Sequence, residues 1–254
     1  MATTQLRPMS LGEILDASFA LIRRHAGVFF GIAIICESLP TGLSLFVQFS
    51  GGAGRHFGLY MLGQLLSMLG YLLVTGASIR VVSHAYLGHE PGMGDALAFA
   101  LEKLGRTFSA GLAAGILTGL ALILLIFPGM IVACGLAVAV QAAVLEPLPA
   151  GSDGVGRSWS LTKGYKWKAF GLYCVVFVLF MLCMLGLGLI AGLVGAIFPP
   201  LMIPAVGALG LLALFVYPFS SCVFTLFYYD LRVRKEAFDL ELLSQHLGIA
   251  PAGA

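Results

Sequence analysis

The stretch FGLYCVVFVLFMLCMLGLGLIAGLVGAIF, residues 170–198, contains no charged side chain. About 20 mostly apolar residues are enough to cross the hydrocarbon core of a bilayer, so this stretch predicts a transmembrane helix. The whole chain agrees: of its 254 residues, 59% are hydrophobic and only 10% are charged, whereas about 25% of the residues of a soluble domain are charged. The sequence therefore predicts an all-α integral membrane protein.

Apolar runs of similar length occur along the rest of the chain. The six predicted spans are approximately Gly27–Phe49, Phe57–Ile79, Ser109–Phe127, Gly129–Leu148, Phe170–Phe198 and Val206–Tyr229. Prolines in FPGM, residues 127–130, and in FPPLMIP, residues 198–204, predict tight reversals because proline interrupts a helix. We therefore expect three helical hairpins within a single membrane domain, residues 1–254.

The cations predict the orientation of these spans, because short loops rich in lysine and arginine remain in the cytoplasm. Of the 14 lysines and arginines, all but Arg55 lie before, between or after the three predicted hairpins. Both termini are therefore expected on the cytoplasmic side. A formal net charge of +2 is too small to suggest a nucleic-acid partner.

Three segments that precede the first, third and fifth spans align without gaps. Two positions correspond in all three: Gly12, Gly94 and Gly156 at one, and Arg24, Arg106 and Lys168 at the other. The first two segments have apolar residues at helical spacing, which is typical of amphipathic helices on a membrane surface. The third, GVGRSWSLTKGYKWKAF at residues 154–170, has cations at some of these positions.

Two interpretations of this alignment stay open. One is a pseudo-threefold repeat, residues 10–90, 92–150 and 154–235, in which each copy is an interfacial helix followed by a hairpin. The other is that the preference for cations at the inner ends of spans produces the alignment by itself.

Glu37 is the one acid well inside a predicted span. Ionisable groups in a membrane are costly and indicate function by default, so a proton or cation relay is one interpretation. The other is a protonated packing residue that forms a hydrogen bond to a neighbouring amide. Gln48, Gln64 and Gln141 are the candidate partners, and no second intramembrane acid or base completes a relay.

The predicted inner ends of the spans are basic and aromatic. Tryptophans beside lysines are typical of interfacial anchors, and anionic lipid is attracted by about 1 kcal/mol per cation. We expect Asp230 and Arg232 either to pair locally or to help form a corner that binds lipid phosphate or a partner. The candidate contact residues are Arg24, Arg106, Trp159, Lys163, Lys166, Trp167, Lys168, Asp230 and Arg232.

Three stretches resemble a known family: LRPMSLGEILDASFALIRRH at residues 6–25, RSWSLTKGYKWKAFGL at 157–172 and YYDLRVRKEAFDLELL at 228–243. They are similar to the family named after the membrane domain of glycerophosphoryl diester phosphodiesterases. The resemblance implies a stand-alone, multi-span protein of the bacterial inner membrane. The soluble phosphodiesterase barrel of the fused members has no counterpart here, so no catalytic residue is implied.

Other features give little reason to expect an enzyme. His84, His89 and Glu90 lack the spacing of a zinc-binding HExxH helix and are interpreted as surface loop residues. Neither a nucleophile elbow nor a phosphate-binding loop is found. We therefore expect no catalysis, no metal and no cofactor.

Small residues recur at a spacing of four in two predicted spans: Gly111, Gly115 and Gly119 in one, and Gly188 and Gly192 in the other. This spacing lets helix backbones approach closely. It predicts either internal packing or an interface between copies of the chain.

The favoured hypothesis is a non-enzymatic scaffold or accessory protein. Its basic cytoplasmic collar, the three interfacial helices with their cations, would contact anionic lipid and a protein partner or a second copy. The alternative is a small transporter or channel with Glu37 in a central polar cavity. An enzyme acting on lipid would require a constellation that the sequence does not contain.

Overall fold

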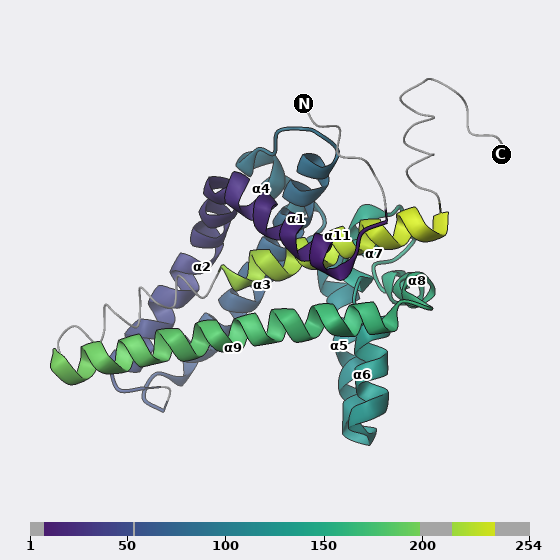
Figure 1. Cartoon of the computed structure of the whole chain (residues 1–254). Coiled ribbons are helices and arrows are strands. Elements are labelled where there is room, and N and C mark those ends of the chain that lie inside the picture. The colour runs from purple at the N-terminus through teal and green to yellow at the C-terminus, as the bar shows by residue number, and fades with distance from the viewer. Residues whose placement is uncertain (1–7, 53, 199–214, 237–254) are drawn as a thin grey trace.

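The computed structural model describes residues 8–52, 54–198 and 215–236, which are helical with no strand among them (Figure 1). The helices are α1 (Leu11–Arg24), α2 (Ala26–Phe49), α3 (Phe57–Tyr86), α4 (Met93–Glu102), α5 (Leu104–Leu124), α6 (Ile126–Gly135), α7 (Ala139–Leu145), α8 (Asp153–Thr162), α9 (Lys166–Ile197) and α11 (Val216–Glu236). The predicted all-α class is confirmed for these residues.

Five helical stretches of the described chain are long and apolar enough to cross a membrane: Ala26–Phe49, Phe57–Tyr86, Leu104–Leu124, Ile126–Leu145 and Lys166–Ile197. They correspond to the first five predicted spans. The sixth prediction, Val206–Tyr229, begins outside the described residues, and its remainder belongs to α11, which is not among the five. The predicted reversal at FPPLMIP also lies mostly outside them.

Two of the predicted hairpins are present. Helices α2 and α3 pack side by side, joined by a turn in which Gly51 and Gly52 have φ values of 124° and 80°, a region that favours glycine. Between α5 and α6 the break falls at Leu125, where the backbone is extended. It therefore precedes the predicted FPGM turn, and Pro128 lies in the first turn of α6, where a missing N–H costs little.

The predicted fourth span, Gly129–Leu148, is not one continuous helix. It is divided into α6 and α7 by a turn at residues 136–138. Continuous apolar character predicted an unbroken helix, but backbone groups freed at a break can be satisfied by neighbouring side chains. Helix α8, which packs on α7, supplies the side chains that bind the backbone groups at this break.

Helix α11 lies at the centre of the fold, and α1, α3, α7, α8 and α9 all contact it. Most of its residues are buried, including the fully enclosed rings of Phe219, Phe227 and Tyr228. A helix that is buried nearly all round must satisfy its polar groups inside the protein. The polar side chains in its C-terminal half must therefore find their partners within the fold.

The three short helices expected before the first, third and fifth spans are present as α1, α4 and α8. Helix α1 begins with a capping box in which Ser10 and Glu13 each bind the other's backbone N–H. Each short helix buries part of one face against another helix: α1 against α11, α4 against α3 and α8 against α7.

Helix α9 and the α5–α6 pair extend away from this core in different directions (Figure 1). Of α9 only Ala169 and Leu172 are buried, and at the α5–α6 turn Ile123 and Phe127 are 83% and 80% exposed. Apolar surface of this extent indicates contact with a membrane or with another protein.

Candidate functional site

Asp230, near the C-terminal end of α11, is fully buried and holds three parts of the chain together. Its carboxylate accepts hydrogen bonds from the backbone N–H of Met9 at 2.7 Å, from Nζ of Lys168 at 2.5 Å and from Nε of Arg234 at 3.0 Å. The Met9 carbonyl accepts from the same two cations. We call these four residues the Asp230 network; it fastens the segment before α1 and the first turn of α9 to α11.

A second network surrounds Glu146, just after α7. Its carboxylate accepts hydrogen bonds from the hydroxyl of Tyr228 at 2.8 Å and from Nε of Arg157 at 2.6 Å. Arg157 also pairs with Glu236 at 2.5 Å, and Nε of Arg232 donates to that same carboxylate at 2.9 Å. Burial raises the pKa of Glu236, but hydrogen bonds from Arg232 and Arg157 outweigh it and lower the pKa below its usual value.

Helix α8 satisfies the backbone at the break between α6 and α7. The Ser158 hydroxyl donates to the Gly135 carbonyl at 2.9 Å and accepts from the Val138 N–H at 3.2 Å. The Thr162 hydroxyl also donates to Gly135, at 2.9 Å. A Cβ at Gly135 would overlap the ring of Trp159, so the glycine lets α8 approach closely. Ser158 and Thr162 of the third segment therefore have a structural use at this break.

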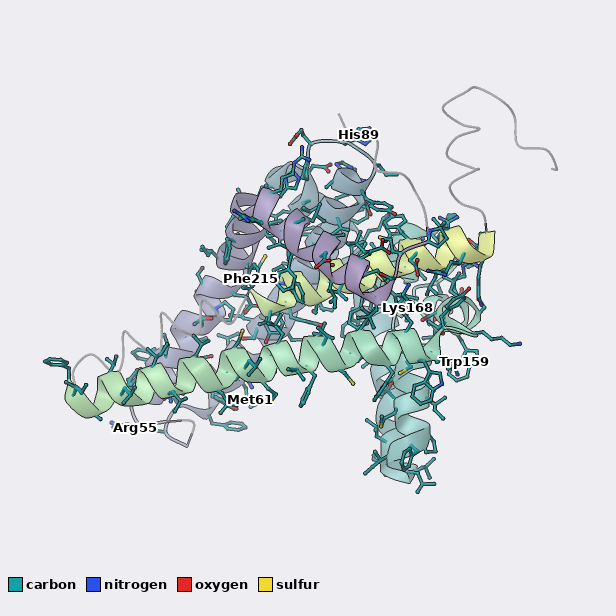
Figure 2. The ribbon with its side chains drawn as sticks, viewed as in Figure 1. Arg55, Met61, His89, Trp159, Lys168 and Phe215 are labelled. Atoms are coloured by element: carbon teal, nitrogen blue, oxygen red, sulfur yellow. The ribbon has the colours of Figure 1, made fainter. Side chains whose placement is uncertain are left out.

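An exposed group of aromatic and cationic side chains lies where α8 meets α9. Trp167 is 86% exposed and Trp159 is 42% exposed, and Nζ of Lys166 lies 3.5 Å from the centroid of the Trp159 ring. Lys163, in the turn between the helices, is exposed as well. We call these four residues the tryptophan–lysine cluster; Figure 2 shows Trp159 at this end and Arg55 at the distant end of the α2–α3 pair.

The remaining candidate contact residues do not form one surface. Arg24 is mostly exposed, 3.8 Å from Glu90, while Arg106 is half-buried and donates to the Glu146 carbonyl at 3.3 Å. Lys168, Asp230 and Arg232 are engaged in the two networks. Arg232 pairs locally with Glu236, while Asp230 pairs both with Arg234 of its own helix and with Lys168 of α9.

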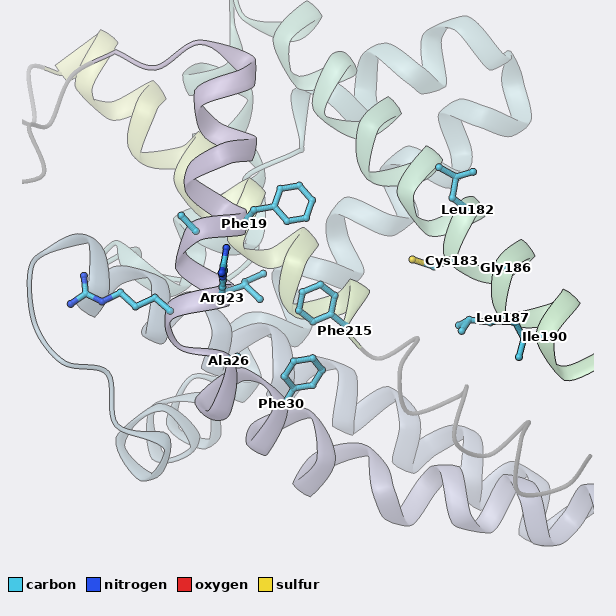
Figure 3. Close-up of a pocket in the computed structure, with 13 residues that line it drawn as sticks. Phe19, Arg23, Ala26, Phe30, Leu182, Cys183, Gly186, Leu187, Ile190 and Phe215 are labelled. Atoms are coloured by element: carbon cyan, nitrogen blue, oxygen red, sulfur yellow. The ribbon is translucent and has the colours of Figure 1, made fainter. Parts of the chain in front are cut away.

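A groove of about 1280 Å³ lies between α1, the start of α2 and the middle of α9. Figure 3 shows Phe19, Arg23 and Phe30 on one side and residues 182–190 of α9 on the other. Small-molecule pockets measure about 300–1,000 Å³ and are mostly apolar, so this groove is larger than most. Its lining is apolar except near Arg23 and Arg24.

The three intramembrane candidates are not brought together. Glu37 is 4% exposed and faces α3, where a Cβ at Gly70 would lie 2.7 Å from its Oε1. Gln64 is exposed, with its amide 3.5 Å from the Tyr60 hydroxyl, and Gln141 is buried on α7. No hydrogen bond joins any two of the three, all of which the structure describes. Neither the groove nor the smaller cavity described below includes Glu37 in its lining.

Of the five glycines in the two stripes, only Gly111 faces another described helix, where its Cβ would lie 4.0 Å from Val140 of α7. A Cβ at Gly115, Gly119, Gly188 or Gly192 would meet no described atom within 4 Å. Internal packing is therefore the wrong interpretation for these four within the described chain, and an interface between copies stays a prediction.

Sequence reasoning missed Glu146, Arg157, Arg234 and the backbone of Met9. Arg234 follows Asp230 by four residues, a spacing at which helical side chains meet, so this pair could have been anticipated. The bond between Asp230 and Met9 joins positions 221 residues apart, and nothing in either local stretch signals it.

Comparisons with protein-family models, with curated proteins and with solved structures found no match for this chain. Its function must therefore be argued from the geometry above.

Proposed function

We propose that the protein is a non-enzymatic membrane protein, a scaffold or accessory factor of the bacterial inner membrane, whose basic cytoplasmic collar contacts anionic lipid and a partner. The observation that carries the proposal is the tryptophan–lysine cluster at the first turn of α9. That helix contains the most apolar stretch among the candidate spans, with a mean hydropathy of 2.9. Tryptophan rings favour the headgroup level of a bilayer, and adjacent lysines attract anionic lipid.

The groove beside α1 supports the same proposal. Its apolar walls suit acyl chains, and Arg23 and Arg24 at its edge suit an anionic headgroup. Within the described chain, Arg24 forms a mostly exposed ion pair with Glu90, and such pairs contribute little, so a lipid phosphate can compete for it.

The two networks at the C-terminal half of α11 have a supporting role in this proposal. They fix α8 and the first turn of α9 relative to α11, and so hold the tryptophan–lysine cluster in place. A rigid collar of this kind suits a protein partner as well as lipid.

Transport remains the alternative suggested by Glu37. Transporters commonly gather several polar groups near the bilayer midplane, and no hydrogen bond brings Gln64 or Gln141 to Glu37 among the described residues. If Glu37→Gln lowered ion or solute flux in proteoliposomes relative to the native protein, transport would replace lipid contact as the leading proposal.

The test of lipid contact uses spin-labelled phosphatidylglycerol and phosphatidylcholine in proteoliposomes. We expect the native protein to restrict the anionic lipid more than the zwitterionic one. Removing the exposed Lys163 and the half-buried Lys166 together, as Lys163→Gln with Lys166→Gln, should reduce that preference, since each cation contributes about 1 kcal/mol, or about five-fold in association. Arg55→Gln, at the distant end, is the matched control. Equal preference in the double variant and the control would overturn the proposal.

A further inference from the structure

A second cavity, of about 330 Å³, lies where the C-terminal ends of α3 and α7 meet α11. The polar residues that matter in its lining are Arg80, Ser83, His84, His89, Tyr229 and Arg232. No acidic residue of the described chain is among its lining residues, although Asp95 lies just outside the lining, against Arg80 and His84. Its position separates it from the tryptophan–lysine cluster and from the groove beside α1, whose linings share no residue with it.

The two arginines are oriented by carboxylates outside the lining. Arg80 donates to both carboxylate oxygens of Asp95, from Nε at 3.0 Å and from Nη2 at 3.5 Å, and Nδ1 of His84 lies 3.8 Å from the same carboxylate. Nε of Arg232 donates to Glu236 at 2.9 Å. A guanidinium has five N–H donors in a rigid fork, so the two bonds to Asp95 fix the plane of the Arg80 group and leave its remaining N–H groups for another acceptor. The planar fork is the geometry that matches carboxylate and phosphate groups.

Histidine and hydroxyl groups extend this set of donors. The rings of His84 and His89 lie 5.9 Å apart, and each imidazole carries at least one N–H donor in any protonation state. The Tyr229 hydroxyl donates to Ser83 Oγ at 2.9 Å, and the ring of Tyr86 stacks on Tyr229 at 5.0 Å. The wall of the cavity is therefore fixed by contacts within the protein.

We propose that this cavity binds a phosphate group, carried by inorganic phosphate, a soluble phosphate ester or a phospholipid headgroup. The Arg80 guanidinium and two imidazoles around a volume of this size, with no carboxylate among the described lining residues, suit a tetrahedral anion with several acceptor oxygens. The volume also leaves room for a small substituent on the phosphate, since small-molecule pockets begin at about 300 Å³. The site does not depend on the lipid contact proposed above, because it uses different residues.

The experiment has a soluble arm and a lipid arm, both with the full-length protein. The soluble arm measures binding of inorganic phosphate and of glycerol 3-phosphate to detergent-solubilised protein by calorimetry at constant ionic strength. The lipid arm measures the association of spin-labelled phosphatidic acid in proteoliposomes. The variants are Arg80→Gln and His89→Gln. Arg55→Gln is the control in both arms, and the double variant of Lys163 and Lys166 is a second control in the soluble arm alone.

We expect Arg80→Gln to weaken phosphate binding by about ten-fold or more, because it removes charge-assisted hydrogen bonds. His89 is exposed in the loop after α3, so His89→Gln should weaken binding by about three-fold or more without affecting folding. An effect in the soluble arm alone identifies a soluble phosphate, and an effect in the lipid arm alone identifies a headgroup. The proposal requires that, in at least one arm, both variants weaken binding and Arg55→Gln leaves it unchanged. If neither arm gives this result, the proposal is overturned.

Discussion

Asp230→Asn should destabilise the protein strongly, although it changes a single atom type. Asp230 is fully buried, and its partner Lys168 is only 14% exposed. The substitution therefore leaves a cation with little access to water and without its counter-charge. Asparagine can still accept a hydrogen bond from the Met9 N–H, so the change in stability reports mainly the loss of the negative charge. Removing one partner of a buried ion pair costs about 3–5 kcal/mol, and we expect a value near the lower end because the Met9 carbonyl still accepts from Lys168 and Arg234.

The assay is unfolding in mixed micelles titrated with dodecyl sulfate and followed by circular dichroism. Glu90→Gln is the matched control, because the Arg24–Glu90 pair spans 3.8 Å with both side chains mostly exposed, and such pairs contribute about 1 kcal/mol at most. Lys168→Met in the Asp230→Asn background completes a double-mutant cycle. The double variant should be less destabilised than the sum of the single variants. If Asp230→Asn were as mild as Glu90→Gln, with native helicity retained, the assignment of Asp230 as the centre of the network would be refuted.

Three further predictions follow from local contacts. Ser158→Ala with Thr162→Val should lower the free energy of unfolding by about 1–3 kcal/mol in the same titration, because the Gly135 carbonyl loses both hydroxyl donors. Ser160→Ala, at an exposed neighbouring position, should lower it clearly less. Equal losses would argue against the role of α8 in satisfying the backbone at the break between α6 and α7. Gly70→Ala should lower the free energy of unfolding by about 1–3 kcal/mol, because its Cβ would lie 2.7 Å from Glu37 Oε1 and 2.8 Å from the Cys36 carbonyl. Gly115→Ala, whose Cβ would meet nothing within 4 Å, should not destabilise the protein. Matching effects of the two variants would contradict the packing of α2 on α3. The folded-state pKa of Glu236 lies below its usual value, so its ionised form stabilises the fold above the unfolded pKa of about 4.3, and that stability is lost as the pH falls through the folded pKa. Glu236→Gln should therefore make the free energy of unfolding less dependent on pH in the acid range. An unchanged pH dependence would assign the acid destabilisation to other groups.

The parts of the fold that the sequence predicted are those that depend on local pattern. The apolar run at residues 170–198 predicts α9 because a membrane helix needs only length and apolar side chains. Spacing of 3.6 residues predicts α1 because one face of the helix is apolar. By contrast, the break between α6 and α7 depends on Ser158 and Thr162, more than 20 residues further along the chain, and no local feature of residues 136–138 signals it.

The sequence indicated many of the residues of the candidate site but not how they are arranged in space. Lys168 aligned with Arg24 and was expected on the same surface, yet it pairs with a buried aspartate. A local sequence pattern gives the spacing of cations along a chain, while burial depends on which helix covers them. The tryptophan–lysine cluster remains exposed because α9 leaves the core beside it.

The most direct test of the proposed lipid contact uses the two tryptophans of the chain. Trp159→Phe leaves Trp167 as the single fluorophore, and proteoliposomes can then be made with lipids brominated at different depths. The account predicts strong quenching by lipids brominated near the headgroup, greater for anionic than for zwitterionic headgroups, because Trp167 is exposed beside Lys163 and Lys166. Quenching by aqueous iodide without any effect of brominated lipid would contradict it.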